Sequence, residues 1–233
     1  MKILAVGMNY AAHNKELNEA LLPKEPVIFS KPDSSILRPG KDFFVPDFSS
    51  RFDYETEIVV RIGRLAKDVS ERFAHRYYDA VTVGIDFTAR DLQAKLRQDG
   101  LPWELCKGFD GSAGLGTFIE KKDLFNIPGC TSVIPEWKPS KSGGTHISEA
   151  TWQELMKDVH FHLDIDGKTV QVGHTANMMF TVDQIVSYVS RFFTLKNGDL
   201  IFTGTPAGVG PIKEGQTLTG YLGEKEVLNL RIR

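Results

Sequence analysis

The sequence contains few cysteines and no long apolar run. Cys106 and Cys130 are the two cysteines of the 233-residue chain, with neither a CxxC spacing nor histidines arranged around them for zinc. We therefore expect two reduced structural thiols rather than a disulfide framework. No apolar stretch approaches the roughly 18 residues that a membrane-spanning helix requires, and residues 3–6 are too short an apolar run for a signal peptide. These absences predict a cytoplasmic protein with no membrane partner.

An excess of one charge is also missing. The chain has 28 Lys and Arg against 30 Asp and Glu, a net charge of −2, which gives no support for a nucleic-acid partner. The hydrophobic content of 41% and the charged content of 25% are typical of globular proteins. A chain of this length can bury a substantial core as one domain.

The most informative stretch covers residues 53–63, where β-branched and aromatic residues follow a period of two. This period predicts a strand, and residues of equal parity lie on one face of a strand. Glu55 and Glu57 should therefore lie side by side. Two adjacent carboxylates repel each other unless a proton or a cation lies between them, and Mg²⁺ is a cation that binds carboxylate oxygens. A solvated acidic face is the alternative.

A second strand with a carboxylate is predicted at residues 80–88. Asp86 lies within an otherwise apolar run, where a carboxylate is costly unless it is paired, hydrogen-bonded or bound to metal. It could instead cap a helix predicted at residues 89–95, although Thr88 is better placed for that role. Asp86 is therefore a candidate functional residue.

Histidines form two further candidate sites. His13 and Glu16 would be neighbours on a helix, and a carboxylate that orients an imidazole is the arrangement of a general base; an ordinary surface pair is the alternative. In a hairpin predicted at residues 159–172 around an Asp-Gly turn, His160 and His162 share a strand face. They are a possible metal pair, but we find no carboxylate of matching face and expect a solvent-exposed face.

Several other segments have recognisable features. Residues 199–210 predict a strand that enters a Gly/Thr loop, which would let a ligand approach backbone N–H groups closely. The glycine-rich stretch 106–116 carries Lys107 but lacks the Walker order of a phosphate loop. Thr181 is the predicted cap of an apolar helix over residues 182–193. Residues 126–157 form an insertion-like loop with little periodicity.

Taken together, these stretches resemble the fumarylacetoacetate hydrolase family. The motifs occur in the family's order and span nearly the whole chain. They are Tyr10-Ala11-Ala12-His13 with Glu16, Phe29-Ser30-Lys31-Pro32, Tyr54-Glu55-Thr56-Glu57, Asp86-Phe87-Thr88-Ala89-Arg90-Asp91 with Gln93, Lys107, Met179-Phe180, and Thr203-Gly204-Thr205-Pro206 with Gly208-Val209-Gly210.

The resemblance implies a mixed α+β, strand-rich fold built on a β-roll, with a single catalytic domain over residues 1–233. Residues 1–20 would supply an N-terminal strand and a lid segment, and the chain would form a homodimer. The family's metal ligands map onto Glu55, Glu57 and Asp86, which would hold Mg²⁺ or Mn²⁺.

The resemblance also implies catalytic and substrate-binding positions. The family's His–Glu dyad maps onto His13 and Glu16, and its active-site lysine maps onto Lys107. The positions that contact substrate map onto Arg90, Gln93 and Thr205.

The small single-domain members that this chain most resembles have acylpyruvate hydrolase and oxaloacetate decarboxylase activity. The resemblance therefore implies divalent-metal-dependent cleavage of a C–C bond in a small 2-oxo acid or dicarboxylate, in which the metal stabilises the developing enolate. One alternative is an isomerase or decarboxylase of 2-hydroxy-dienedioates in aromatic catabolism, which would use the same ligands. Another is a non-catalytic protein that binds a metal or a carboxylate.

Overall fold

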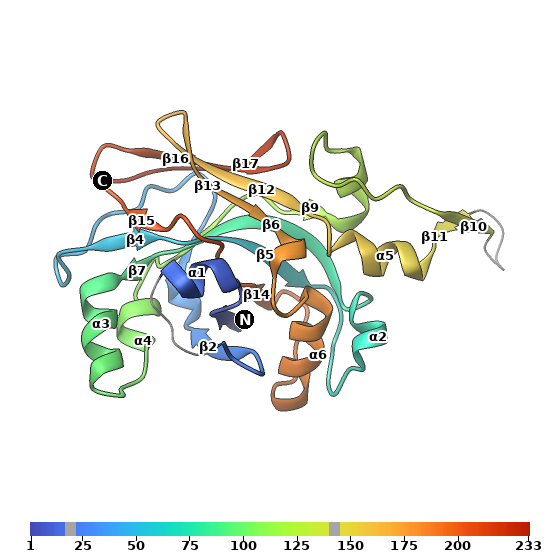
Figure 1. Cartoon of the computed structure of the whole chain (residues 1–233), viewed down its shortest axis with the longest axis horizontal. Helices are drawn as coiled ribbons and strands as arrows, with labels where there is room; N and C mark the ends of the chain where they lie inside the picture. The colour runs from blue at the N-terminus through green and yellow to red at the C-terminus, as the bar shows by residue number, and fades with distance from the viewer. Residues whose placement is uncertain (17–21, 140–144) are drawn as a thin grey trace.

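The computed structural model describes residues 1–16, 22–139 and 145–233, and these form the expected mixed α+β fold dominated by strands (Figure 1). The largest sheet has the strand order β2-β1-β14-β5-β6-β8-β3, with β9 paired to β6. Its strands are β1 (Ile3–Gly7), β2 (Val27–Lys31), β3 (Ile36–Leu37), β5 (Thr56–Ile62), β6 (Tyr78–Asp86), β8 (Ala113–Leu115), β9 (Ile119–Glu120) and β14 (Leu200–Phe202).

Three smaller sheets accompany the largest one. They have the orders β13-β12-β16-β17, β15-β4-β7 and β10-β11. Their strands are β12 (His160–Ile165), β13 (Lys168–His174), β16 (Thr217–Leu222), β17 (Lys225–Arg231), β4 (Phe52–Tyr54), β7 (Thr88–Ala89), β15 (Gly210–Pro211), β10 (Trp137–Pro139) and β11 (Thr145–Ile147). The predicted hairpin is confirmed as β12–β13, and its turn has positive φ at Asp166 (51°) and Gly167 (77°), as a tight two-residue turn requires.

Short helices connect or cover the sheets. They are α1 (Ala11–Glu16), α2 (Glu71–Ala74), α3 (Arg90–Gln98), α4 (Glu104–Lys107), α5 (Glu149–Leu155) and α6 (Val182–Phe192), with 3₁₀ turns η1 (Asp33–Ser35), η2 (Lys121–Asn126) and η3 (Thr175–Asn177).

The predicted helix caps have different outcomes. Thr181 caps α6 as predicted, through a capping box in which its hydroxyl accepts from the backbone N–H of Gln184 and the Gln184 side chain accepts from the N–H of Thr181. The prediction for Thr88 was wrong, because α3 begins after Ala89 and the Thr88 hydroxyl accepts a hydrogen bond from Lys107 instead.

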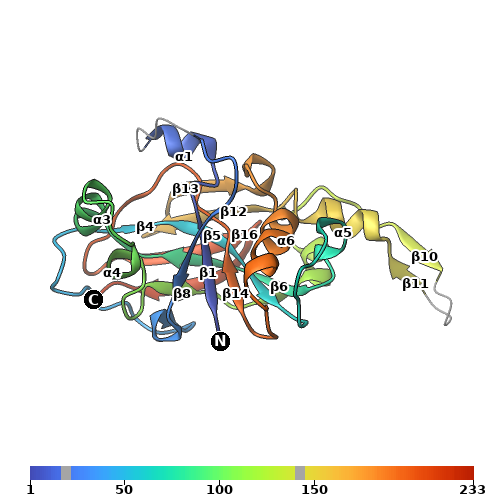
Figure 2. The ribbon, with the colours of Figure 1, turned by 90° about the horizontal axis from the view of Figure 1, so that it is seen from below.

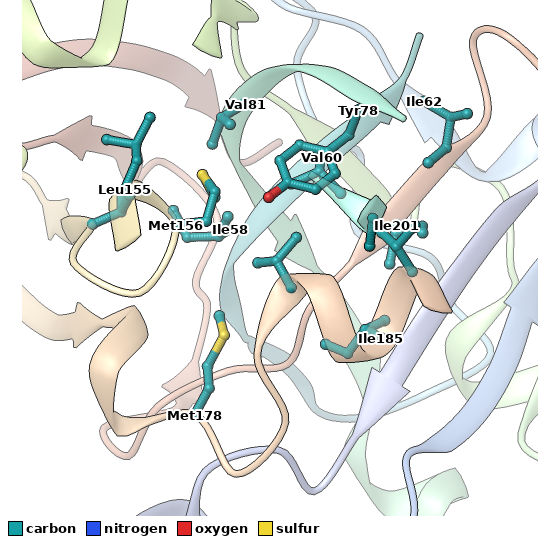
Figure 3. Close-up of a cluster of buried hydrophobic side chains, with 14 of the residues drawn as sticks. Ile58, Val60, Ile62, Tyr78, Val81, Leu155, Met156, Met178, Ile185 and Ile201 are labelled. Carbon is teal, nitrogen blue, oxygen red and sulfur yellow. The ribbon is translucent and has the colours of Figure 1, made fainter. Parts of the chain in front are cut away.

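Side chains at alternate positions of β5 pack in two different clusters of the apolar core. Ile58, Val60 and Ile62 pack in one cluster with apolar residues of α6, among them Ile185 (Figure 3). Val59, on the opposite face, is buried in a second cluster. Burial of each such side chain contributes about 1.5–3 kcal/mol. Both faces of β5 are therefore buried, and the carboxylates on the Val59 face do not lie on a solvated surface.

The insertion-like segment carries regular structure. Residues 126–157 contain the hairpin β10–β11 and helix α5, which extend away from the sheets as an arm (Figures 1 and 2). Residues 140–144 within it lie outside the described residues, as do residues 17–20 of the predicted lid segment. No helix in the described ranges is long and apolar enough to cross a membrane.

Candidate active site

The candidate site lies at a corner where three chain segments pass from the largest sheet to the three-stranded sheet. β5 follows β4 across Glu55, β6 continues into β7 across Phe87, and β14 leads through a loop into β15. The first two crossings are joined directly, because the backbone N–H of Asp86 donates to the carbonyl of Glu55 at 2.8 Å. Strands that change sheets bend at such corners. Here the bends bring residues from three separate segments together.

Three carboxylates converge at this corner. One oxygen of each of Glu55, Glu57 and Asp86 lies within 4.8 Å of the others, and the exposed fractions of the residues are 6%, 1% and 0%. The backbone N–H of Gly204 donates to Glu57 Oε2 at 2.7 Å. Gly204 has a φ of +95°, and a Cβ there would lie 2.7 Å from Asn9 Cβ, so this close approach of the loop requires glycine.

Two buried lysines neutralise part of this charge. Lys107 Nζ donates to Glu55 Oε2 at 2.7 Å and to Asp86 Oδ2 at 2.8 Å, while Lys31 Nζ lies 2.6 Å from Asp86 Oδ1. Burial opposes the charged form of Lys107, but Asp86 and Glu55 outweigh it and raise the pKa of this ammonium. Burial lowers the pKa of Lys31, against the opposing effect of Asp86. Lys107 is therefore the firmly protonated partner.

The pKa values of Glu55 and Glu57 are shifted in opposite directions. Burial opposes ionisation of Glu55, but Lys107 and Arg90 outweigh it and hold its pKa well below the usual range. Burial raises the pKa of Glu57 well above its ordinary value, and the nearby charges of Asp86 and Glu55 raise it further. Glu57 is thus the carboxylate whose negative charge the surrounding side chains match least well.

The carboxylate oxygens at this corner are ligands that suit a hard divalent cation. Three carboxylates within reach of one another suit Mg²⁺ or Mn²⁺, which bind oxygen ligands and keep several positions for water or substrate. A cation would also favour the ionised form of Glu57, which burial and its neighbours disfavour. The residues present therefore fit such an ion.

The predicted His–Glu pair lies beside the carboxylates. His13 Nδ1 is 3.2 Å from Glu16 Oε2, and the backbone N–H of Gly208 donates to both oxygens of Glu16 at 3.2 and 3.3 Å. Asn14 anchors α1 by donating from Nδ2 to the carbonyl of Met8 at 2.9 Å. A carboxylate that accepts from Nδ1–H leaves Nε2 as the proton-accepting nitrogen. The pair thus has the form of a general base.

Arg90 is braced from three sides. Its guanidinium donates to Asp53 Oδ2 at 2.8 Å, to Glu55 Oε1 at 2.7 Å and to Gln93 Oε1 at 2.6 Å. A guanidinium has five N–H donors, and two of them have no partner within residues 1–16, 22–139 and 145–233. Those two could donate to a substrate. The same contacts fix one oxygen of Glu55 while Lys107 holds the other.

Thr205 is held by a hydrogen-bonded chain. Its hydroxyl donates to the Thr56 carbonyl at 2.9 Å and accepts from Gln171 Nε2 at 2.8 Å. Gln171 also donates to the Pro206 carbonyl at 2.7 Å and accepts from the Thr56 N–H at 3.1 Å. Because the Thr205 hydroxyl donates its proton to the Thr56 carbonyl, it could only accept a hydrogen bond from a substrate.

The candidate residues come together in one cavity. Its lining includes every catalytic, substrate-binding and metal-binding position implied by the family resemblance except Glu16, which is linked to the cavity through His13. The residues concerned are His13, Glu55, Glu57, Asp86, Arg90, Gln93, Lys107 and Thr205.

Three buried polar residues of the site were missed. Lys31 belongs to the Phe-Ser-Lys-Pro motif, and its position at the end of β2 gave no sign of its contact with Asp86. Gln171 lies in the distant hairpin. Asn9 bonds to the carbonyls of Thr203 and Phe180 at 2.7 and 3.0 Å, so it ties the segment before α1 to the Gly/Thr loop.

Comparison with known proteins places the chain among characterised relatives. The model of the fumarylacetoacetate (FAA) hydrolase C-terminal family matches residues 2–233. A mitochondrial oxaloacetate tautomerase of Arabidopsis thaliana is 40% identical over 230 residues, 97% of this chain and 88% of the relative. A mitochondrial oxaloacetate decarboxylase of Dictyostelium discoideum is 36% identical over 218 residues, 93% of this chain and 86% of the relative.

A solved structure is similar over the whole length of this chain. The fumarylpyruvate hydrolase of Pseudomonas aeruginosa, crystallised in complex with Mn²⁺ and pyruvate, has a TM-score of 0.79 and 30% sequence identity. The match covers 100% of this chain and 89% of the hydrolase. The likeness therefore extends to both sequence and fold.

Removal of Lys107 should destabilise the folded protein, because Lys107 is the cation shared by Glu55 and Asp86. We expect Lys107→Met to lower the free energy of unfolding by about 3–5 kcal/mol, because two buried carboxylates lose their shared cation. The matched control Lys157→Met removes an exposed pair with Glu154 and should cost about 0–1 kcal/mol. Urea unfolding at neutral pH measures both, and saturating Mg²⁺ should recover part of the loss. Equal stability of Lys107→Met and wild type would contradict this account.

Proposed function

Because the chain belongs to the fumarylacetoacetate hydrolase family, we propose that it is a divalent-metal-dependent enzyme acting on small 2-oxo acids. Its reaction would be cleavage of a C–C bond, by hydrolysis of an acylpyruvate or decarboxylation of oxaloacetate. The observation that carries this proposal is the meeting of three buried carboxylates, Lys107 and the His13–Glu16 pair around one cavity. A protein that only binds a metal has no need of the His–Glu pair.

The metal would be held by Glu55, Glu57 and Asp86. When bound, Mg²⁺ or Mn²⁺ supplies Lewis-acid stabilisation of negative charge on the oxygens of a 2-oxo acid. Arg90 has two N–H donors without a partner among the described residues, and these suit a substrate carboxylate. Lys107 supplies a fixed positive charge beside Glu55 and Asp86.

The His13–Glu16 pair would provide the proton transfers of hydrolysis. Glu16 accepts from Nδ1–H, so His13 Nε2 takes a proton from water, and the hydroxide formed bonds to the distal carbonyl carbon. The bond between that carbon and the methylene carbon then breaks. Its electron pair goes to the 2-oxo acid half, beside Lys107. The methylene carbon then takes up the proton that His13 Nε2 removed from water, which gives pyruvate and returns His13 to its neutral form. The products are pyruvate and a carboxylic acid.

A second candidate reaction is tautomerisation of a 2-oxo acid. The specific observation in its favour is the relative named oxaloacetate tautomerase, which is 40% identical to this chain. A base that moves a proton on and off carbon needs no attacking water, so the same His13–Glu16 pair could perform it. Measurement of hydrolysis, decarboxylation and enol–keto conversion on one preparation would separate the three reactions.

Loss of one carboxylate should remove metal and turnover together. We expect Glu57→Gln to weaken Mn²⁺ binding by more than about 100-fold, since even residues that only support a ligand cost 10–100-fold. Acetylpyruvate hydrolysis, followed by its ultraviolet absorbance, should fall in parallel. The control Glu226→Gln changes an exposed carboxylate and should leave both unchanged. Full activity of Glu57→Gln in the presence of a chelator would refute the metal assignment.

The role of His13 predicts a separation of reactions. His13→Gln should lower acylpyruvate hydrolysis by about 10²–10⁴-fold, the usual contribution of a general base. Mn²⁺ affinity and oxaloacetate decarboxylation should persist, because neither needs an activated water. His162→Ala, which alters a histidine stacked on Tyr221, is the matched control. Normal hydrolysis by His13→Gln would show that the base has been misassigned.

A further inference from the structure

A second cluster of metal-binding side chains lies where β12 and β13 pair. His160 and His174 are directly opposite in the antiparallel ladder. The backbone groups of His160 bond away from β13, its N–H to the Cys130 carbonyl at 2.8 Å and its carbonyl to the Gly223 N–H at 2.9 Å. Such a pair places its side chains close together. The two imidazole rings accordingly stack with centroids 3.8 Å apart and an interplanar angle of 14°.

Asp158 completes the cluster. It lies two residues before His160, and its Oδ1 is 2.8 Å from His174 Nε2 and 3.8 Å from His160 Nε2. Its other oxygen accepts from the N–H and hydroxyl of Ser132 at 2.7 and 2.6 Å and from the Thr131 hydroxyl at 3.2 Å. Those three bonds fix the carboxylate with Oδ1 directed at both histidines.

The Asp158 carboxylate is thus supported on its outer side by Ser132 and Thr131. A carboxylate held by outer hydrogen bonds, next to two imidazoles, is the arrangement found around many protein-bound transition metals.

We propose that Asp158, His160 and His174 form a second metal site, selective for Zn²⁺ or a similar transition ion rather than for Mg²⁺. Their ligand atoms lie within 4.8 Å of one another, and two imidazoles with one carboxylate are ligands that Zn²⁺ prefers, with a fourth position left for water. The side chain of His160 is 48% exposed and its Nε2 lies 3.8 Å from Asp158 Oδ1, a separation that one ion bound to both atoms could span. The oxygen-only set at Glu55, Glu57 and Asp86 suits a harder cation.

The position of the cluster suggests what the metal would do. Thr131 and Ser132 begin the segment that carries β10, β11 and α5, and Asp158 ends it. This segment extends from the sheets as the arm in Figure 1. An ion shared by Asp158, His160 and His174 would therefore tie the base of the arm to the edge of the four-stranded sheet.

Zinc titration of the intact chain tests the site. Chelator-stripped protein, held in millimolar Mg²⁺, is titrated with Zn²⁺ by calorimetry. We expect wild type to bind one equivalent more than the double variant His160→Ala/His174→Ala, in which that equivalent binds at least about 100-fold more weakly. His162→Ala, the neighbouring histidine on the same strand, should keep the additional equivalent. Zn²⁺ should also raise the melting temperature of wild type more than that of the double variant.

A second measurement does not depend on the folding of any variant. In wild-type protein, one equivalent of Zn²⁺ should shift the imidazole resonances of His160 and His174 and leave those of His162 in place. Equal stoichiometry in wild type and the double variant, or an absence of shifts at His160 and His174, would overturn the proposal. Failure of Glu55, Glu57 and Asp86 to bind Mn²⁺ would contradict the proposed function and not the second metal site, because the two sites share no ligand.

Discussion

The burial of three carboxylates at one sheet corner is the constraint on which the rest of the site depends. Glu55, Glu57 and Asp86 are each at most 6% exposed, and a buried charge is tolerated only when an opposite charge or hydrogen bonds accompany it. Lys107 meets this need for Glu55 and Asp86. Glu57 receives one backbone N–H from Gly204, and burial, followed by the nearby charges of Asp86 and Glu55, raises its pKa. A divalent cation would offset these effects.

The corner also separates two chemical roles in space. On the sheet side, rigid strands and the braced Arg90 hold the acidic and cationic groups. On the other side, α1 carries His13, and Glu16 links it to the Gly/Thr loop through Gly208. The group proposed to move protons thus lies on α1, while the groups proposed to stabilise charge lie on or next to β5, β6, α3 and α4. Such a division would let one charge-stabilising site support cleavage and tautomerisation alike.

Local patterns predicted much of the fold. The alternation in residues 53–63 identified the strand, the Asp-Gly turn located the hairpin and Thr181 marked the start of α6. The same alternation did not reveal that Glu55 lies at a crossing between sheets, because period-two patterning carries no information about which sheet a strand joins. The arm was also missed, since its hairpin is short and lacks a periodic apolar face.

The site was predicted less evenly. Glu55, Glu57 and Asp86 stood out because carboxylates interrupt apolar strands, and the spacing of His13 and Glu16 indicated a candidate general base. The resemblance supplied the role of Lys107. Contacts between distant segments left no sequence signal: Lys31 meets Asp86 across 55 positions, and Gln171 meets Thr205 from another sheet. The carboxylate that matches His160 was overlooked because Asp158 precedes the predicted strand. The homodimer and the cytoplasmic location stay predictions.

The carboxylate metal site can be tested by anomalous diffraction from crystals grown with Mn²⁺ and oxalate, a stable analogue of a 2-oxo acid dianion. We expect one strong anomalous peak in contact with carboxylate oxygens of Glu55, Glu57 and Asp86, with oxalate between that peak and Lys107. We also expect the Lys107 ammonium to shift from its present position between Glu55 and Asp86. A carboxylate corner without a peak, with Lys107 still bridging the two acids at saturating Mn²⁺, would contradict this metal assignment.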